Sequence, residues 1–152
     1  MITMLGKKAP DFSLESSNGL SVSLDQLRGS FVVLIFYPAN DTPTCDRQLA
    51  EANLNLQEFL QSNARVFGVN TASTAKQKEY CQRKRLEFPI LSDPGGRVAR
   101  QFKAHTWWLP LNRRTVVVVN PQGNICFYKR GFPTAEEILS AIKNAAAQSD
   151  SG

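Results

Sequence analysis

Two short apolar runs joined by a helix-like segment constrain the fold of this 152-residue chain. SFVVLIFY (30–37) and ARVFGVN (64–70) are rich in β-branched and aromatic residues and are bounded by turn residues, which is typical of buried strands. Between them, DRQLAEANLNLQEFL (46–60) carries apolar residues at helical spacing. A strand, a helix and a strand in this order predict a right-handed crossover with the two strands parallel.

The rest of the chain predicts elements that extend this unit: a helix (74–87), a short extended segment (88–93), a β-hairpin (115–129) and a closing helix (134–148). Ser73 and Thr134 stand at N-cap positions, and Glu137 would complete a capping box with Thr134. A parallel half followed by an antiparallel hairpin and a final helix predicts an α/β, thioredoxin-like fold, with a central mixed β-sheet flanked by helices.

The length and the hydropathy pattern favour one domain over residues 1–148, followed by a frayed C-terminal tail at 149–152. No apolar run approaches the roughly 20 residues that cross a bilayer, and the first residues lack the apolar centre of a signal peptide. We therefore expect a protein that starts near Met1, lies in the cytoplasm and does not associate with membranes.

Three cysteines and one histidine, without a C-x-x-C pair or a Cys/His cluster, argue against a metal site and against a disulfide framework. We expect no metal and no cofactor, and we interpret the cysteines as core residues or as redox groups. The net charge of +5 includes a basic segment at 76–85, but this segment lacks stacking aromatics and a nucleic-acid motif. Nucleic acid is therefore not an expected partner.

The stretch FYPANDTPTC (36–45) places a cysteine at the start of a predicted helix. If Thr42 is the N-cap, Pro43 takes the first helical position, where its missing N–H has no cost, and Cys45 takes the third. The unpaired N–H groups and the positive end of the helix dipole favour a thiolate over a thiol there. Cys45 is then a nucleophile; the alternative is that it is a small apolar residue at a helix start.

The same stretch matches Pro-x-x-x-Thr-x-x-Cys after a strand that ends in Phe-Tyr, and it resembles the peroxiredoxins. The resemblance covers most of the chain, and it is strongest to the bacterioferritin-comigratory (BCP) or PrxQ group. The further segments that carry it are APDFSL, SLDQLRG, FPILSDPGGRVARQF, and an arginine ahead of VVVN-PQG-NI. It implies a thiol-dependent peroxidase in which the thiolate of Cys45, the peroxidatic residue, attacks a peroxide and becomes a sulfenic acid.

The resemblance also implies roles around Cys45. Thr42 would hydrogen-bond in the thiolate and peroxide site, in addition to capping the helix. Pro38 would shield the sulfur from water, although it also reads as a strand terminator. Six residues before Asn120 lies Arg114, which would stabilise the thiolate and the peroxide oxygens. Neighbouring Arg113 should point to the other face, because side chains alternate along a strand.

Three positions depart from the family pattern, at Thr44, Asp46 and Gln48, where glycine, threonine and an acidic residue are usual. Asp46 suits the helix dipole but adds a negative charge near the thiolate. These departures bear on the rate of the peroxide reaction more than on the kind of reaction that the resemblance implies.

The resolving cysteine implied by the resemblance is Cys81, because the position five residues after Cys45 is Ala50. An intramolecular Cys45–Cys81 disulfide would then form and would be recycled by thioredoxin or a similar thiol reductant. Basic neighbours at 78 and 83–85 should help the Cys81 thiol to ionise. The alternative is a buried helix cysteine. Cys126, on a predicted strand, is interpreted as structural.

The implied substrates are hydrogen peroxide and organic hydroperoxides, and the implied assembly state is a monomer. Trp107 and Trp108 would line the peroxide entrance, receive an alkyl tail or pack over the core, and His105 lacks a recognisable partner. Two rival functions remain open. A thioredoxin-like thiol-disulfide oxidoreductase would normally use C-x-x-C, which is absent, and a non-catalytic binding module would need no reactive sulfur.

Overall fold

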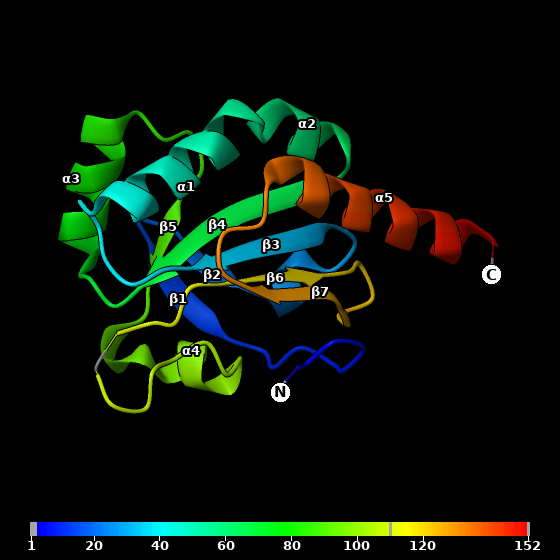
Figure 1. The fold of residues 1–152 in the computed structure, drawn as a ribbon, viewed down its shortest axis with the longest axis horizontal. Coiled ribbons are helices and arrows are strands. Elements are labelled where there is room, and N and C mark those ends of the chain that lie inside the picture. Colours follow the sequence, from blue (N-terminus) through cyan, green and yellow to red (C-terminus); the bar gives the residue numbers. More distant parts are fainter. Residues whose placement is uncertain (1–2, 110, 152) are drawn as a thin grey trace.

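The computed structural model describes residues 3–109 and 111–151, and within them the chain forms one mixed β-sheet of seven strands (Figure 1). The strand order across the sheet is β2-β1-β5-β4-β3-β6-β7. Strands β3, β4 and β5 are parallel to one another, and the remaining pairs are antiparallel. The strands are β1 (Ser13–Ser16), β2 (Ser21–Ser23), β3 (Phe31–Phe36), β4 (Ala64–Asn70), β5 (Ile90–Ser92), β6 (Thr115–Val119) and β7 (Ile125–Arg130).

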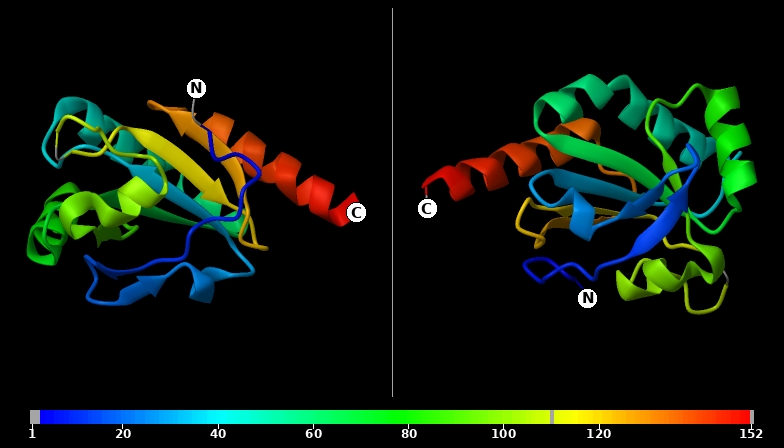
Figure 2. Two further views of the ribbon diagram at one scale, coloured as in Figure 1. Left: turned by 90° about the horizontal axis from the view of Figure 1, so that it is seen from below. Right: turned by 180° about the vertical axis from the view of Figure 1, so that it is seen from behind.

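Helices cover both faces of this sheet. They are α1 (Pro43–Leu54), α2 (Leu56–Gln61), α3 (Thr74–Lys84), α4 (Arg97–Gln101) and α5 (Ala135–Ser151), with short 3-10 turns at Asp25–Leu27 and Pro94–Gly96. Helices α1, α2 and α5 lie over one face, and α4 lies over the other together with the N-terminal segment (Figures 1 and 2). None of the helices in the described residues has the length and apolar character needed to span a membrane.

Strand β3 forms the centre of the core, because all six of its residues are buried. Its side chains alternate between two apolar clusters. Val33 and Ile35 pack with residues of α1, α2 and α5, whereas Leu34 and Phe36 pack with α4 and the N-terminal segment. The strand is therefore rigidly held where it ends, which is where the candidate site begins.

The predicted crossover and hairpin are confirmed: β3 pairs in parallel with β4, and β6 pairs antiparallel with β7. The prediction of a single helix over residues 46–60 is wrong. Two helices occupy this stretch, and they meet at Asn55, whose side chain donates to the Glu51 carbonyl at 2.9 Å. The expected helix 74–87 ends at Lys84, followed by Arg85 in a left-handed conformation. The sequence analysis did not predict the hairpin β1–β2, which extends the sheet beyond β5.

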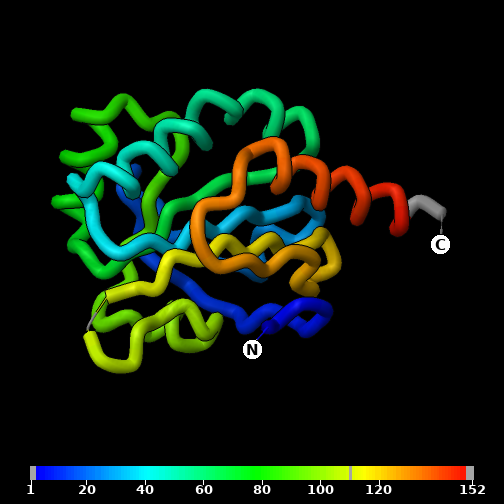
Figure 3. The backbone as a smooth tube through the Cα atoms, viewed as in Figure 1, coloured from blue at the N-terminus to red at the C-terminus, as the bar shows by residue number. Residues whose placement is uncertain are grey.

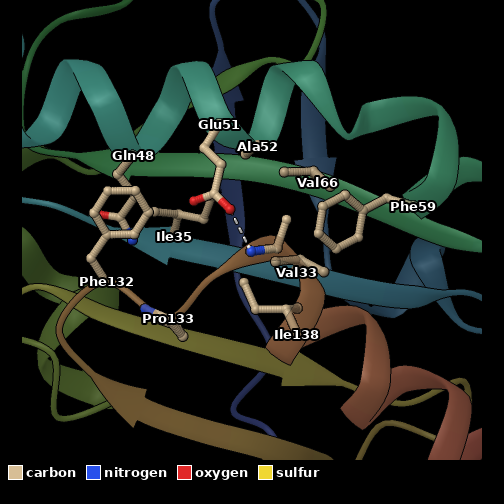
Figure 4. Close-up of a pocket in the computed structure, with 11 residues that line it drawn as sticks. Val33, Ile35, Gln48, Glu51, Ala52, Phe59, Val66, Phe132, Pro133 and Ile138 are labelled. Atoms are coloured by element: carbon tan, nitrogen blue, oxygen red, sulfur yellow. Dashed lines mark hydrogen bonds between the residues drawn. The ribbon is translucent and has the colours of Figure 1, made fainter.

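The start of α5 is held from two directions. Thr134 accepts the Glu137 N–H at 3.1 Å, but the Glu137 carboxylate contacts Lys129 at 2.6 Å, so the expected capping box is only half formed. Instead, the Glu51 carboxylate of α1 accepts the N–H of Ala135 at 2.7 Å (Figure 4). Helix α5 runs to Ser151, three residues beyond the predicted end at 148.

Candidate active site

The loop after β3 leads Cys45 into the first turn of α1. Thr42 is the N-cap with extended backbone angles, Pro43 is the first helical residue and Cys45 is the third, as predicted. Thr42 caps through its backbone only. In the part of the chain that the structure describes, its hydroxyl makes no capping bond and instead donates to the Ala39 carbonyl at 3.3 Å. The predicted N-cap position of Thr42 is therefore confirmed, but the hydroxyl takes no part in the cap.

Cys45 is 1% exposed, and Arg114 reaches its sulfur: Nη2 of Arg114 lies 3.2 Å from Sγ of Cys45. The sheet register explains the contact. Thr115, the first residue of β6, pairs with Phe36, the last residue of β3, so Arg114 lies at the end of β3 from which the loop departs. Arg113 is exposed, in agreement with the predicted alternation. The guanidinium and the first turn of α1 thus bring positive charge to one buried sulfur.

Gln48 was noted in the sequence only as a departure from the family pattern, yet it is a direct partner of Arg114. Its Oε1 accepts Nη1 of Arg114 at 2.8 Å, and the residue is 2% exposed. Its side-chain nitrogen has no hydrogen-bond partner among the described residues. Gln48 lines a narrow apolar cavity beneath α1 together with Ile35 and Phe132 (Figure 4). The spacing of one helical turn from Cys45 was the signal that could have identified it.

The carboxylate of Asp46 is turned towards α3, which lies beside the first turn of α1 (Figure 3). The Tyr80 hydroxyl donates to Oδ1 of Asp46, and Nζ of Lys84 lies 3.3 Å from Oδ2. The negative charge that the sequence placed near Cys45 is therefore compensated by a cation and a hydroxyl of another helix.

Cys81 lies on α3 and is partly buried, with its thiol 3.5 Å from the Ser17 hydroxyl. Burial raises the pKa of the Cys81 thiol above its ordinary value, partly offset by that hydrogen bond. The expectation that basic neighbours would help it to ionise is wrong. Arg83 pairs with Asp41 and with Glu79, and Lys84 pairs with Asp46. All three cysteines are free thiols.

Cys126 lies on β7 and is partly buried against the core on the α1 side of the sheet. Burial raises the pKa of its thiol to about 11. Its strand neighbours Ile125 and Phe127 pair with Val119 and Val118, and these residues pair with the first half of β3. Cys126 therefore lies towards the end of the sheet opposite Cys45, and its structural role stays a prediction.

Pro38 is half-buried and lines a hollow together with Asp41, Tyr80 and Leu111. Trp107 and Trp108 are 85% and 60% exposed, so the alternative that they pack over the core is wrong. Their rings contact each other edge-on, with 5.5 Å between centroids. Pro110, in the same loop, lies outside the described residues.

His105 lies in the same loop as the tryptophans and forms an isolated backbone bridge with Asn112. Its Nδ1 atom is buried without a hydrogen-bond partner in the residues that the structure describes. Within residues 3–109 and 111–151, no cluster of His, Cys, Asp and Glu side chains could hold a metal ion.

Comparisons with known proteins agree with this geometry. The AhpC/TSA family model matches residues 5–128. Chloroplastic peroxiredoxin Q of Arabidopsis thaliana is 36% identical over an alignment of 145 residues, and this alignment covers 91% of this chain and 65% of that relative. The putative peroxiredoxin bcp of Helicobacter pylori is 31% identical over an alignment of 147 residues, and this alignment covers 91% of this chain and 97% of the relative. The chain spans 64% of the length of the rice relatives that it matches.

The crystal structure of peroxidoxin BcpB from Mycobacterium tuberculosis has a TM-score of 0.85 to this one at 27% identity, over 94% of this chain and 98% of that one. This likeness confirms the predicted thioredoxin-like fold, in which a mixed sheet is flanked by helices. The family model extends from the N-terminal segment into the β6–β7 hairpin and includes the loop, α1 and Arg114. The chain therefore belongs to the AhpC/TSA family, among the peroxiredoxins of the Q or BCP type.

Proposed function

We propose that the protein is a thiol-dependent peroxidase with Cys45 as its nucleophile. The observation that carries the proposal is the contact between Nη2 of Arg114 and Sγ of Cys45, 3.2 Å long and formed at a sulfur that is 1% exposed. A cation and a helix N-terminus at one cysteine favour its thiolate. In the proposed reaction the thiolate attacks one peroxide oxygen, the O–O bond breaks, and the departing oxygen leaves as water or an alcohol after it takes a proton.

Other residues of the site have supporting roles in this proposal. Arg114 stabilises the thiolate and the negative charge that develops on the departing oxygen. Gln48 holds the guanidinium in place through a neutral acceptor, so that the positive charge of Arg114 is not cancelled by a carboxylate. Pro38 shields the sulfur from water, and the Thr42 hydroxyl hydrogen-bonds to the peroxide.

The second half of the proposed cycle uses Cys81. Its sulfur attacks the sulfenic acid of Cys45, an S–S bond forms, and water leaves. A thioredoxin-type thiol donor then reduces the disulfide. Hydrogen peroxide and organic hydroperoxides are the proposed substrates. The monomeric state and the cytoplasmic location stay predictions from the sequence.

The reduced protein is expected to consume hydrogen peroxide and to fail to reduce insulin disulfides. A thioredoxin-like thiol-disulfide oxidoreductase would reduce insulin, and a binding module would do neither. Both assays are run on the same reduced preparation, with thioredoxin as the positive control for insulin reduction. Insulin reduction without peroxide consumption would contradict the proposal.

A further inference from the structure

The residues next to the two proposed redox cysteines are bonded to each other. Asp46 follows Cys45 in the chain, Tyr80 precedes Cys81, and the Tyr80 hydroxyl donates to the Asp46 carboxylate. Nζ of Lys84, one turn further along α3, lies 3.3 Å from the second carboxylate oxygen. We call these three residues the Asp46–Tyr80–Lys84 clamp. It joins the first turn of α1 to the last half of α3.

With the clamp closed, the two cysteine side chains point towards different partners and not towards each other. The sulfur of Cys45 faces Arg114, which lies just before β6. The sulfur of Cys81 faces Ser17, which lies just after β1 and is itself bonded to the Ile90 N–H at 3.0 Å. A disulfide requires Cα atoms within about 7 Å and side chains turned towards each other. Both sulfurs must therefore leave these partners before the S–S bond can form, and we expect the backbone of α1 or α3 to move with them.

Such a movement must break the clamp, because each cysteine is directly attached to a clamp residue. Tyr80 is 1% exposed and the Asp46 side chain is 28% exposed, so their hydrogen bond is partly screened from water, where hydrogen bonds to charged groups are stronger. A second set of bonds reinforces the same junction. Asn40 donates to Gln77 at 2.9 Å, and Arg83 forms two bonds to Asp41, at 2.7 and 3.0 Å.

We propose that Tyr80 and Asp46 are positioning residues that set how fast Cys81 resolves the sulfenic acid of Cys45. The inference rests on the proposed peroxidase function and on Cys81 as the resolving cysteine. A tight clamp prolongs the life of the sulfenic acid. A second peroxide molecule then has time to transfer an oxygen to it, which gives a sulfinic acid and water and ends turnover. The clamp therefore also sets the sensitivity of the protein to over-oxidation.

The test is Tyr80→Phe, which removes the hydroxyl and keeps the ring and the net charge. Rapid quenching and mass spectrometry follow the sulfenic acid and the disulfide after one equivalent of hydrogen peroxide. We expect disulfide formation from the sulfenic acid to be roughly tenfold faster than in the unmodified protein. The first oxidation of Cys45 is timed separately, because Asp46 loses one of its compensating partners in this variant. The hydrogen peroxide concentration that converts half of the protein to the sulfinic acid should rise by about the same factor.

The matched control is Glu79→Gln, because Glu79 pairs with Arg83 inside α3 and does not reach α1. Equal rates of disulfide formation in Tyr80→Phe, Glu79→Gln and the unmodified protein would contradict the proposed role of the clamp. They would not contradict the proposed peroxidase function. Failure of the unmodified protein to oxidise Cys45 would instead contradict the proposed function. If Tyr80→Phe does not fold, Lys84→Met replaces it, with an expected increase in disulfide rate of about twofold, since this ion pair is partly exposed. An unchanged rate in Lys84→Met would then overturn the clamp.

Discussion

Replacement of Cys45 by serine is expected to abolish peroxide turnover and to leave the fold intact. Serine has nearly the same size as cysteine, so the buried position at the start of α1 is filled as before. Its hydroxyl does not ionise near neutral pH, so neither the helix N-terminus nor Arg114 can produce a nucleophile there. Hydrogen peroxide consumption with excess thiol reductant measures the activity, and circular dichroism measures the fold.

The matched control for this variant is Cys126→Ser, because Cys126 lies on β7, towards the opposite end of the sheet. Its turnover should equal that of the unmodified protein. Full activity in Cys45→Ser with an unchanged circular-dichroism spectrum would show that another group carries the chemistry.

Replacement of Arg114 by alanine is expected to slow the reaction with hydrogen peroxide by roughly 10²- to 10³-fold, the usual cost of removing one preorganised donor from a transition state. The variant loses the donor 3.2 Å from the sulfur and the positive charge that stabilises the thiolate. Stopped-flow measurement of peroxide loss under single-turnover conditions gives the rate.

Arg113→Ala is the control for this effect, since Arg113 is exposed and makes no side-chain bond to the site among the described residues. We expect a change of less than about twofold, as for most surface substitutions. If Arg113→Ala were slow and Arg114→Ala fast, the assignment of the two arginines to opposite faces would be reversed in solution.

The sequence was sufficient for the centre of the fold. The two apolar runs on either side of residues 46–60 predict β3, β4 and their parallel pairing. Short strands that are apolar throughout are typical of a sheet covered on both faces, as parallel sheets are. The alternation of side chains also separates Arg114 from Arg113. In both cases a local pattern in the chain, the length of an apolar run or the alternation of side chains, determines the strand or the direction of the side chain.

What the sequence analysis missed depends on tertiary contacts. The helix breaks at Asn55 although the apolar stripe in the sequence continues past it. The hairpin β1–β2 pairs with β5, which is distant from it in the chain. The partners of Gln48 and Asp46 are Arg114, just before β6, and Tyr80 of α3, which lie 66 and 34 residues away in the chain. Two residues that looked like simple departures from a pattern are thus both engaged at the candidate site.

The basic neighbours of Cys81 illustrate the same limit. Their number in the sequence suggested an easily ionised thiol. In the structure Arg83 and Lys84 form ion pairs with carboxylates, whereas the Cys81 thiol points the other way and contacts Ser17, just after β1. Charge density along a chain therefore did not predict the electrostatic environment of one atom.

The most direct test of the proposed chemistry is mass spectrometry of the reduced protein after one equivalent of hydrogen peroxide, with peptide mapping of every cysteine. We expect Cys45 to be oxidised and linked to Cys81 within the same chain, while Cys126 stays a free thiol. In Cys81→Ser the same treatment should leave sulfenic or sulfinic acid on Cys45. Unmodified Cys45, or a disulfide between Cys45 and Cys126 or between Cys45 residues of two chains, would contradict the proposed chemistry.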